Sequence, residues 1–179
     1  MRAEDILYFW FTEAGEAAWW KKSKEFDEIV RRRFLDTFEK AALGEFAHWR
    51  DRPRGRLAEI ILLDQFPRNM FRDTPRAFAT DGMALALSQE AVRAGAGQGL
   101  SGDERAFLYM PHMHSESLHV HHEAVRLFSE PGLEEQLDFE RRHKAIIKRF
   151  GRYPHRNAIL GRVSTEEEEE FLKEPGSSF

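Results

Sequence analysis

The chain has 179 residues, of which 41% are hydrophobic and 32% are charged, and its formal net charge is −4. This length suits one domain with a substantial core, so we predict a single domain over residues 1–179. The small net charge gives no basic field that would favour a nucleic acid or an anionic membrane as partner. The absence of cysteine excludes disulfides and thiolate metal sites.

Targeting signals are not evident. The longest apolar run, residues 6–11, is too short to span a bilayer. Acidic Glu4 and Asp5 precede this run, which is unlike a signal peptide. We therefore expect a soluble protein in the cytoplasm, and neither a membrane nor a nucleic acid as partner.

Apolar residues recur at three- and four-residue steps almost throughout, and no convincing alternating run appears. The pattern predicts an all-α fold of roughly seven to nine helices joined by short connections. Such helices can stack as a tetratricopeptide-like antiparallel array or fold as a compact bundle. The clearest predicted helices begin at residues 23, 57, 81, 101, 118, 133 and 164 and end at or just before residues 44, 67, 95, 111, 131, 150 and 172.

Several side chains are typical of helix ends. Pro67 is expected to close one helix, and Pro111 to end or kink another. Helix N-caps are expected at Ser23 and Asp81, and capping boxes at Ser101 with Glu104 and at Ser164 with Glu167.

Three stretches combine helix breaks with many functional groups: residues 63–72, 109–116 and 148–163. Guanidinium groups suit carboxylates and phosphates, and functional side chains favour helix ends and loops. We therefore expect an anion at the third stretch, either a ligand or the acids of the chain itself. That stretch contains no acidic residue and holds Arg149, Arg152, His155, Arg156 and Arg162.

If the three stretches converge, they form a pocket with a possible base, a possible acid and two anion-binding groups. The same charges could instead form buried ion pairs that hold the helix ends together. The histidines and amides beside the charges favour a ligand site, although both interpretations stay open. The pocket would contain Asp64, Arg68, His114, Glu116, His155 and Arg156.

Other charged patterns have simpler explanations. His119 and His122 lie three residues apart, but no His-Glu-x-x-His pattern accompanies them, so we expect no metal. Four arginines around Pro53 are more economically a solvated turn than an RNA contact. The acidic run 166–170 suits a helix N-terminus and could also pair with the arginines before it.

The three stretches resemble the bacterial domain-of-unknown-function family 924. The similarity is carried by residues 62–69, 77–81, 110–116 and 149–162, and by shorter matches at 9–11 and 164–167. It implies an all-α fold of the tetratricopeptide-like class and supplies no reaction. The positions that match the family pattern suggest a site of Asp64, Arg68, Asn69, His114, Glu116, Arg152, His155, Arg156 and Asn157.

The chain also departs from the family pattern. His112 and Tyr153 stand where phenylalanine is expected, and His121-His122 stand where Asp-Gln is expected. The additional histidines are therefore peculiar to this chain, which further weakens the metal hypothesis.

Our leading hypothesis is a pocket for a small anionic molecule, held by Arg152 and Arg156 with Arg68 assisting. If the site is catalytic, acid–base hydrolysis or transfer fits best, and it requires no cofactor. The alternative is a tetratricopeptide-like groove that binds a peptide or its C-terminal carboxylate, and a third possibility is a purely structural role. The assigned roles are catalytic for Asp64, His114, Glu116 and His155, and ligand-binding for Arg68, Asn69, Arg152, Arg156 and Asn157.

Overall fold

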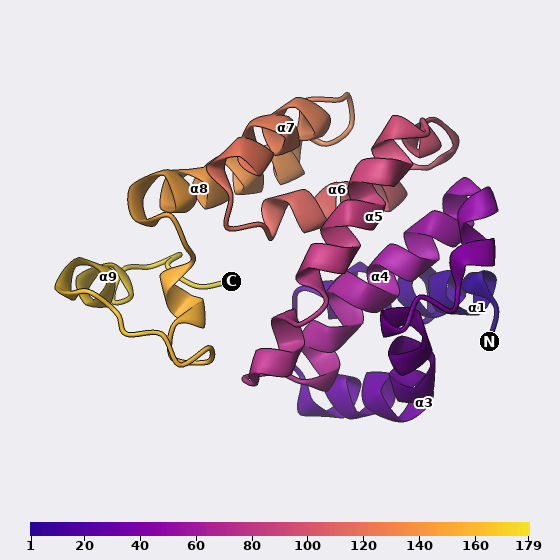
Figure 1. Ribbon diagram of the computed structural model, residues 1–179, viewed down its shortest axis with the longest axis horizontal. Coiled ribbons are helices and arrows are strands. Elements are labelled where there is room, and N and C mark those ends of the chain that lie inside the picture. Colours follow the sequence, from indigo (N-terminus) through magenta and orange to yellow (C-terminus); the bar gives the residue numbers. More distant parts are fainter.

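The computed structural model describes residues 1–179 and contains nine α-helices and no strand, which confirms the predicted all-α class (Figure 1). The helices are α1 (Ala3–Tyr8), α2 (Glu16–Trp19), α3 (Lys24–Ala42), α4 (Pro53–Met70), α5 (Asp81–Arg93), α6 (Gly102–Met113), α7 (Leu118–Phe128), α8 (Glu134–Phe150) and α9 (Glu166–Phe171). Shorter pieces are a π-helical segment, Phe9–Ala14, and the 3₁₀ turns Ala47–Asp51, Pro75–Phe78, Ala96–Gly99 and Pro154–Arg156.

Helix α4 is the centre of the larger core. It packs against α1, α3, α5 and α6, and every residue from Leu57 to Pro67 is buried. Such all-round burial is typical of a helix enclosed by others rather than of one with a solvent face. Polar groups on the inner part of α4 are consequently forced to find partners within the protein.

The prediction that Pro67 closes this helix is wrong, because α4 continues to Met70. Proline has no N–H to donate to the carbonyl group of Leu63. The hydroxyl of Thr80 donates to that carbonyl instead, over 2.6 Å. The proline therefore ties the start of α5 to α4, and the additional turn carries Arg68. Pro111 likewise lies inside α6 and does not end it.

Helix capping follows the sequence in two places and departs from it in two others. Asp81 is the first residue of α5 and makes no cap, because its carboxylate binds Arg68. The last capping box lies one residue later than expected, at Thr165 and Glu168. Glu168 also accepts hydrogen bonds from Arg152, which favours the capping box at this position. The caps at Ser23 and at Ser101 with Glu104 are confirmed.

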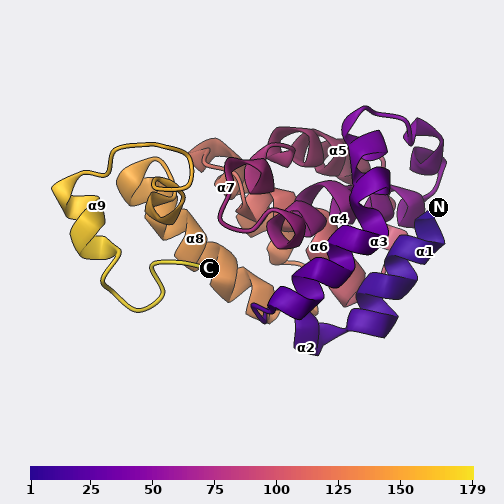
Figure 2. The ribbon, with the colours of Figure 1, turned by 90° about the horizontal axis from the view of Figure 1, so that it is seen from below.

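A second, smaller core lies at the C-terminal end, where Ile146, Ile147, Tyr153 and Phe171 pack together. The segment that follows α9 turns back toward the middle of the molecule (Figures 1 and 2). None of the helices combines the length and the apolar character that crossing a membrane requires.

Candidate functional site

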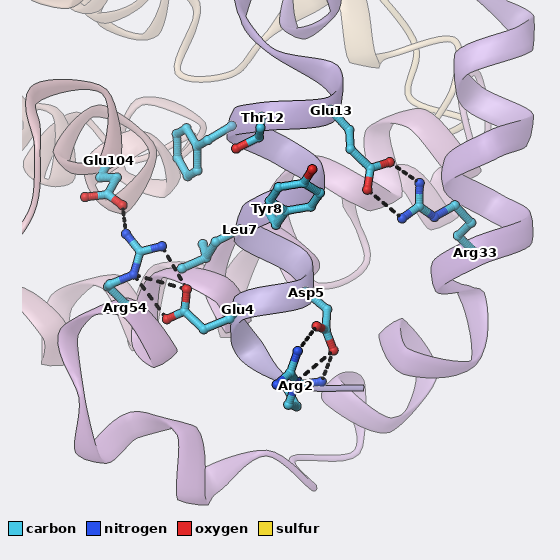
Figure 3. A pocket seen from close by; sticks show the side chains of 11 residues that line it. Arg2, Glu4, Asp5, Leu7, Tyr8, Thr12, Glu13, Arg33, Arg54 and Glu104 are labelled. Atoms are coloured by element: carbon cyan, nitrogen blue, oxygen red, sulfur yellow. Dashed lines mark hydrogen bonds and ion pairs between the residues drawn. The ribbon is translucent and has the colours of Figure 1, made fainter.

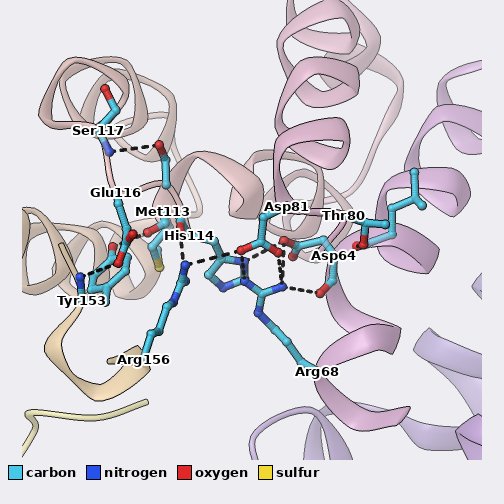
Figure 4. A network of polar contacts seen from close by, with 12 residues as sticks. Asp64, Arg68, Thr80, Asp81, Met113, His114, Glu116, Ser117, Tyr153 and Arg156 are labelled. Carbon is cyan, nitrogen blue, oxygen red and sulfur yellow. Dashed lines mark hydrogen bonds and ion pairs between the residues drawn. The ribbon is translucent and has the colours of Figure 1, made fainter. Parts of the chain in front are cut away.

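The C-terminal ends of α4 and α6 meet the start of α5 and the 3₁₀ turn Pro154–Arg156 (Figure 4). Asp64 and Arg68 come from α4 and lie one helical turn apart, so both face the same side. We call the five charged or titratable residues that meet here the polar cluster: Asp64, Arg68, Asp81, His114 and Arg156.

Asp64 and His114 form a hydrogen-bonded carboxylate–imidazole pair. Oδ1 of Asp64 lies 2.8 Å from Nδ1 of His114, and the Gln65 side-chain amide donates to Oδ2 over 2.6 Å. Asp64 is only 1% exposed. Burial alone would raise its pKa, but His114 and the nearby Arg68 guanidinium outweigh burial and hold the pKa below its usual range. Asp64 is therefore a carboxylate at neutral pH.

His114 is neutral at pH 7, since burial and the positive charge of Arg68 lower its pKa below the ordinary value. A carboxylate can only accept a hydrogen bond, so the ring proton lies on Nδ1, toward Asp64. The other nitrogen, Nε2, then carries a lone pair, and it makes no hydrogen bond within the chain. His114 is consequently arranged as a base whose orientation is set by Asp64.

Asp81 is shared between two guanidinium groups. Arg68 binds it through two parallel hydrogen bonds, of 2.8 and 2.9 Å. Arg156 reaches the same carboxylate only over 3.4 Å, and its other terminal nitrogen donates to the backbone carbonyl of His114 over 3.0 Å. Arg68 is therefore well paired, whereas Arg156 has only a long contact with an acid already in use.

The guanidinium of Arg156 is enclosed by rings. It lies 4.7 Å from the ring centroid of Phe78 and 4.7 Å from that of Tyr153. Its Nε atom is buried and has no hydrogen-bond partner. Burial and repulsion from Arg68 lower the pKa of Arg156. Such an underpaired, buried cation is unusual, because buried polar groups are nearly always satisfied.

His155, which precedes Arg156 in the chain, also has an unsatisfied buried atom. Its Nδ1 is buried without a partner. Burial, with the charge of Arg156, lowers the pKa of His155 to about 3, so the ring is neutral at physiological pH. The positive charge of Lys22 also acts in this direction. His155 therefore lies beside the polar cluster, but no hydrogen bond joins it to the residues of the cluster.

Two predicted residues form neither a hydrogen bond nor an ion pair with the polar cluster. Asn69 faces α3, where its amide donates to Asp27 over 2.9 Å. Glu116 accepts two hydrogen bonds from Arg162, of 2.7 and 2.8 Å, and a third of 2.7 Å from the Tyr153 backbone N–H. All oxygens of Glu116 are thus engaged in holding the loop after α8 against the end of α6.

Arg152 and Asn157 belong to a separate cluster around Glu168 of α9. Arg152 donates to both oxygens of Glu168, over 2.6 and 2.7 Å. The Asn157 amide donates to the hydroxyl of Ser164 over 3.0 Å. Part of the acidic run after residue 165 thus pairs with the arginines that precede it, which was one of the two expectations for this run.

The histidines of α7 are not gathered at one site. His119 and His122 are exposed, whereas His121 is fully buried and lies 2.7 Å from Oε1 of Glu140 in α8. Its other nitrogen, Nε2, lies 2.9 Å from the carbonyl oxygen of Ser115 and must donate to it. The short contact with Glu140 then needs a proton between Nδ1 and Oε1, and burial, which raises the pKa of Glu140, favours a proton on the carboxyl group. No group of three or more His, Asp or Glu side chains is arranged to hold a metal ion.

The Glu140→Gln variant is expected to gain stability relative to the wild type as the pH rises above about 4.5. Burial raises the pKa of Glu140 from that ordinary value. In the folded wild type Glu140 thus keeps its proton to a higher pH than in the unfolded chain, which costs stability as the pH rises from 4.5 to the raised pKa. The glutamine amide donates permanently and removes this dependence. Urea unfolding from pH 5 to pH 8 measures it, with a slope of up to about 1.4 kcal/mol per pH unit. Parallel curves for the two proteins would contradict a raised pKa of Glu140.

A cavity of about 760 Å³ lies elsewhere, beside α1 and the π-helical segment (Figure 3). Every cation that lines it is paired within the chain, so it offers no unpaired cation to an anion. Three arginines line it and each pairs with a carboxylate: Arg2 with Asp5, Arg33 with Glu13, and Arg54 with Glu4 and Glu104.

Some arginines of the basic turn around Pro53 also pair with carboxylates within the protein. Arg50 makes two hydrogen bonds of 2.7 Å to the buried carboxylate of Glu59, and Arg54 lies in the cavity wall described above. At least two of the four arginines thus connect the turn to the helices rather than face solvent alone.

The sequence motifs do not identify two residues of the site region. From its position Asp81 is expected to cap a helix. It also lies within residues 77–81, which carry the family resemblance, and this is the sequence signal that could have identified it as a site residue. Tyr153 is fully buried, and its hydroxyl donates to the Met113 carbonyl over 2.5 Å. The available signal is its hydroxyl, since Tyr153 stands where the family pattern has phenylalanine.

Comparisons with known proteins agree with the resemblance seen in the sequence. The model of the family described as "Bacterial protein of unknown function (DUF924)" matches residues 6–176. The solved structure of the protein of unknown function ATU0120 from Agrobacterium tumefaciens is similar to the present one, with a TM-score of 0.91. The two sequences are 40% identical, and the match covers 96% of each chain. No curated protein matches the chain.

Proposed function

The chain belongs to the bacterial DUF924 family, and we propose that its polar cluster binds a small anionic molecule and presents His114 to it as a base. The cytoplasmic location expected from the sequence stays a prediction. The family description names no activity, so the residues of the cluster carry the proposal.

The underpaired guanidinium of Arg156 carries the proposal. Its side chain is 6% exposed, the only carboxylate with which it forms an ion pair lies 3.4 Å away and is shared with Arg68, and its Nε has no partner. A small carboxylate or phosphate would supply the missing acceptor through a charge-assisted hydrogen bond. Purely structural pairing would be expected to resemble that of Arg68, whose contacts with Asp81 are short and parallel.

The Asp64–His114 pair supplies the proton chemistry. Nε2 of His114 could accept a proton from a water molecule or a hydroxyl group that attacks the bound anion. The resulting imidazolium would be stabilised by Asp64, which already accepts the hydrogen bond from Nδ1. This arrangement supports hydrolysis or group transfer that needs no cofactor. The attacking oxygen bonds to the acyl carbon or phosphorus of the anion while its proton moves to His114, and the bond to the leaving group then breaks as the imidazolium gives that proton to the leaving group.

The burial of Arg156 favours a small ligand over a peptide. A peptide lying in an open tetratricopeptide-like groove would contact arginines on an exposed concave face. Arg156 is instead enclosed by Phe78 and Tyr153. We therefore place the interaction module second, with the same guanidinium as its anchor.

Arg156→Lys is expected to weaken the binding of inorganic phosphate and of propionate by about tenfold or more, because an ammonium cannot reproduce the guanidinium contacts. Isothermal titration calorimetry measures both affinities. Arg142→Lys is the matched control, since Arg142 is exposed on α8 and pairs with Asp138. Equal affinities of Arg156→Lys and the wild type, or a wild type that binds neither anion, would contradict the proposal.

A further inference from the structure

A wall of three rings lies beside the polar cluster, and a fourth ring is seated on it. We define the ring wall as His143, Tyr153 and His155. The ring of Phe179 lies 3.8 Å from His143, 4.5 Å from His155 and 5.2 Å from Tyr153, measured between centroids. The contacts with His155 and Tyr153 are edge-to-face, at 70° and 86°. This geometry is the one that aromatic pairs prefer.

We propose that the ring wall is a subsite for the aromatic ring of the anionic ligand, and that Phe179 occupies this subsite within the chain. The proposal rests on the proposed function, because it assigns the ring to a molecule whose anionic group binds Arg156. It commits the ligand to a small aromatic carboxylate, in which a few bonds separate the ring from the charge.

The position of Tyr153 joins the two parts of the ligand site. One neighbour of its ring is Phe179, and another is the guanidinium of Arg156, 4.7 Å from the ring centroid. A ring that replaced Phe179 would therefore lie one side chain away from the cation. The proposal requires the ligand to pass the edge of Tyr153, with its ring against the ring wall and its carboxylate at Arg156.

The two histidines of the wall behave as neutral rings. Nδ1 of His143 donates to the Phe139 carbonyl over 2.8 Å, which fixes its tautomer. Burial lowers the pKa of both His143 and His155 to about 3. Neither ring therefore carries a charge that would repel an apolar group, and the unpartnered Nδ1 of His155 remains for a polar group of the ligand.

Phe179 is a removable occupant rather than a core residue. It is 48% exposed, in contrast to Tyr153, which is fully buried. A ligand ring could displace it without opening either hydrophobic core, to which Phe179 does not belong. In the wild type this residue would compete with the ligand, and its removal would raise the affinity.

The test compares 3-phenylpropionate with propionate in wild type and in Phe179→Ala by isothermal titration calorimetry. We expect Phe179→Ala to bind 3-phenylpropionate about tenfold more tightly than the wild type does, with propionate changed less than about twofold. Phe139→Ala is the control, because Phe139 is a similarly exposed phenylalanine on α8. It should change neither affinity.

The outcomes of this test distinguish failure of the ring subsite from failure of the anion site. If propionate binds and depends on Arg156, but the phenyl group adds no affinity in Phe179→Ala, the ring subsite is wrong and the anion site stands. The same holds if 3-cyclohexylpropionate binds as tightly as 3-phenylpropionate. If the wild type binds neither propionate nor phosphate, the proposed function itself fails, and the subsite fails with it.

Discussion

Replacing Asp64 by alanine is expected to lower the free energy of unfolding by about 3–5 kcal/mol. The carboxylate is buried and accepts hydrogen bonds from His114 and Gln65, and it also faces the guanidinium of Arg68. Without it, these donors lose their acceptor in a position that water does not reach. Urea denaturation at pH 7 measures the loss.

Asp36→Ala is the control for this prediction. Asp36 is an exposed carboxylate on α3 that pairs with Lys40, and its removal should leave the free energy of unfolding nearly unchanged. The effect of Asp64→Ala should also shrink in acid. Because the folded pKa of Asp64 is lowered, its contribution is present above its usual pKa of 3.8 and disappears as the pH falls. Equal, small losses for the two variants would refute the assignment of Asp64 as the buried anchor.

Glu168→Ala is expected to destabilise the protein by about 2–4 kcal/mol without changing phosphate affinity. Glu168 is 2% exposed and accepts hydrogen bonds from Arg152 and from the backbone N–H of Thr165. Its loss would leave Arg152 without its carboxylate and α9 without its capping box. Thermal unfolding and phosphate titration of the same preparation separate the two effects.

The prediction for Glu168→Ala distinguishes a structural ion pair from a ligand-binding site. Arg152 and Asn157 were expected to bind the ligand, yet both contact Glu168 or its neighbours. Glu170→Ala serves as the control, since Glu170 is exposed and pairs only with Lys173. A large loss of phosphate affinity in Glu168→Ala would return Arg152 to the ligand site and contradict our assignment.

The helices could be predicted because their signals are local. Apolar spacing identified α3, α7 and α8 to within a residue or two of their ends. The exception at Pro67 shows where local reasoning fails. A hydroxyl from another part of the chain, that of Thr80, replaced the hydrogen bond that proline cannot make.

The convergence of the three motif stretches could also be predicted, but their partners could not. Arginine is equally suited to a ligand and to an internal carboxylate, so the sequence cannot assign one or the other. The structure gives Arg152 and Arg162 short internal contacts and leaves Arg156 with a long one. This difference depends on how helices far apart in sequence approach each other.

Two further features depend entirely on tertiary packing. His121 and Glu140 lie on different helices, and neither is part of a recognisable motif. Phe179 follows α9 by several residues, and only the return of this segment toward α8 brings it to His143. Local pattern reasoning would treat each of these as an ordinary helical or surface residue.

The ring nitrogens of His114, observed by ¹⁵N NMR with and without inorganic phosphate, test the anion site most directly. At pH 7 we predict a proton on Nδ1, a lone pair on Nε2 and a pKa below the ordinary value. Added phosphate should raise this pKa in the wild type, because a bound anion stabilises the imidazolium, and should not do so in Arg156→Lys. A proton on Nε2, or a titration that concentrated phosphate leaves unchanged, would contradict the proposed site.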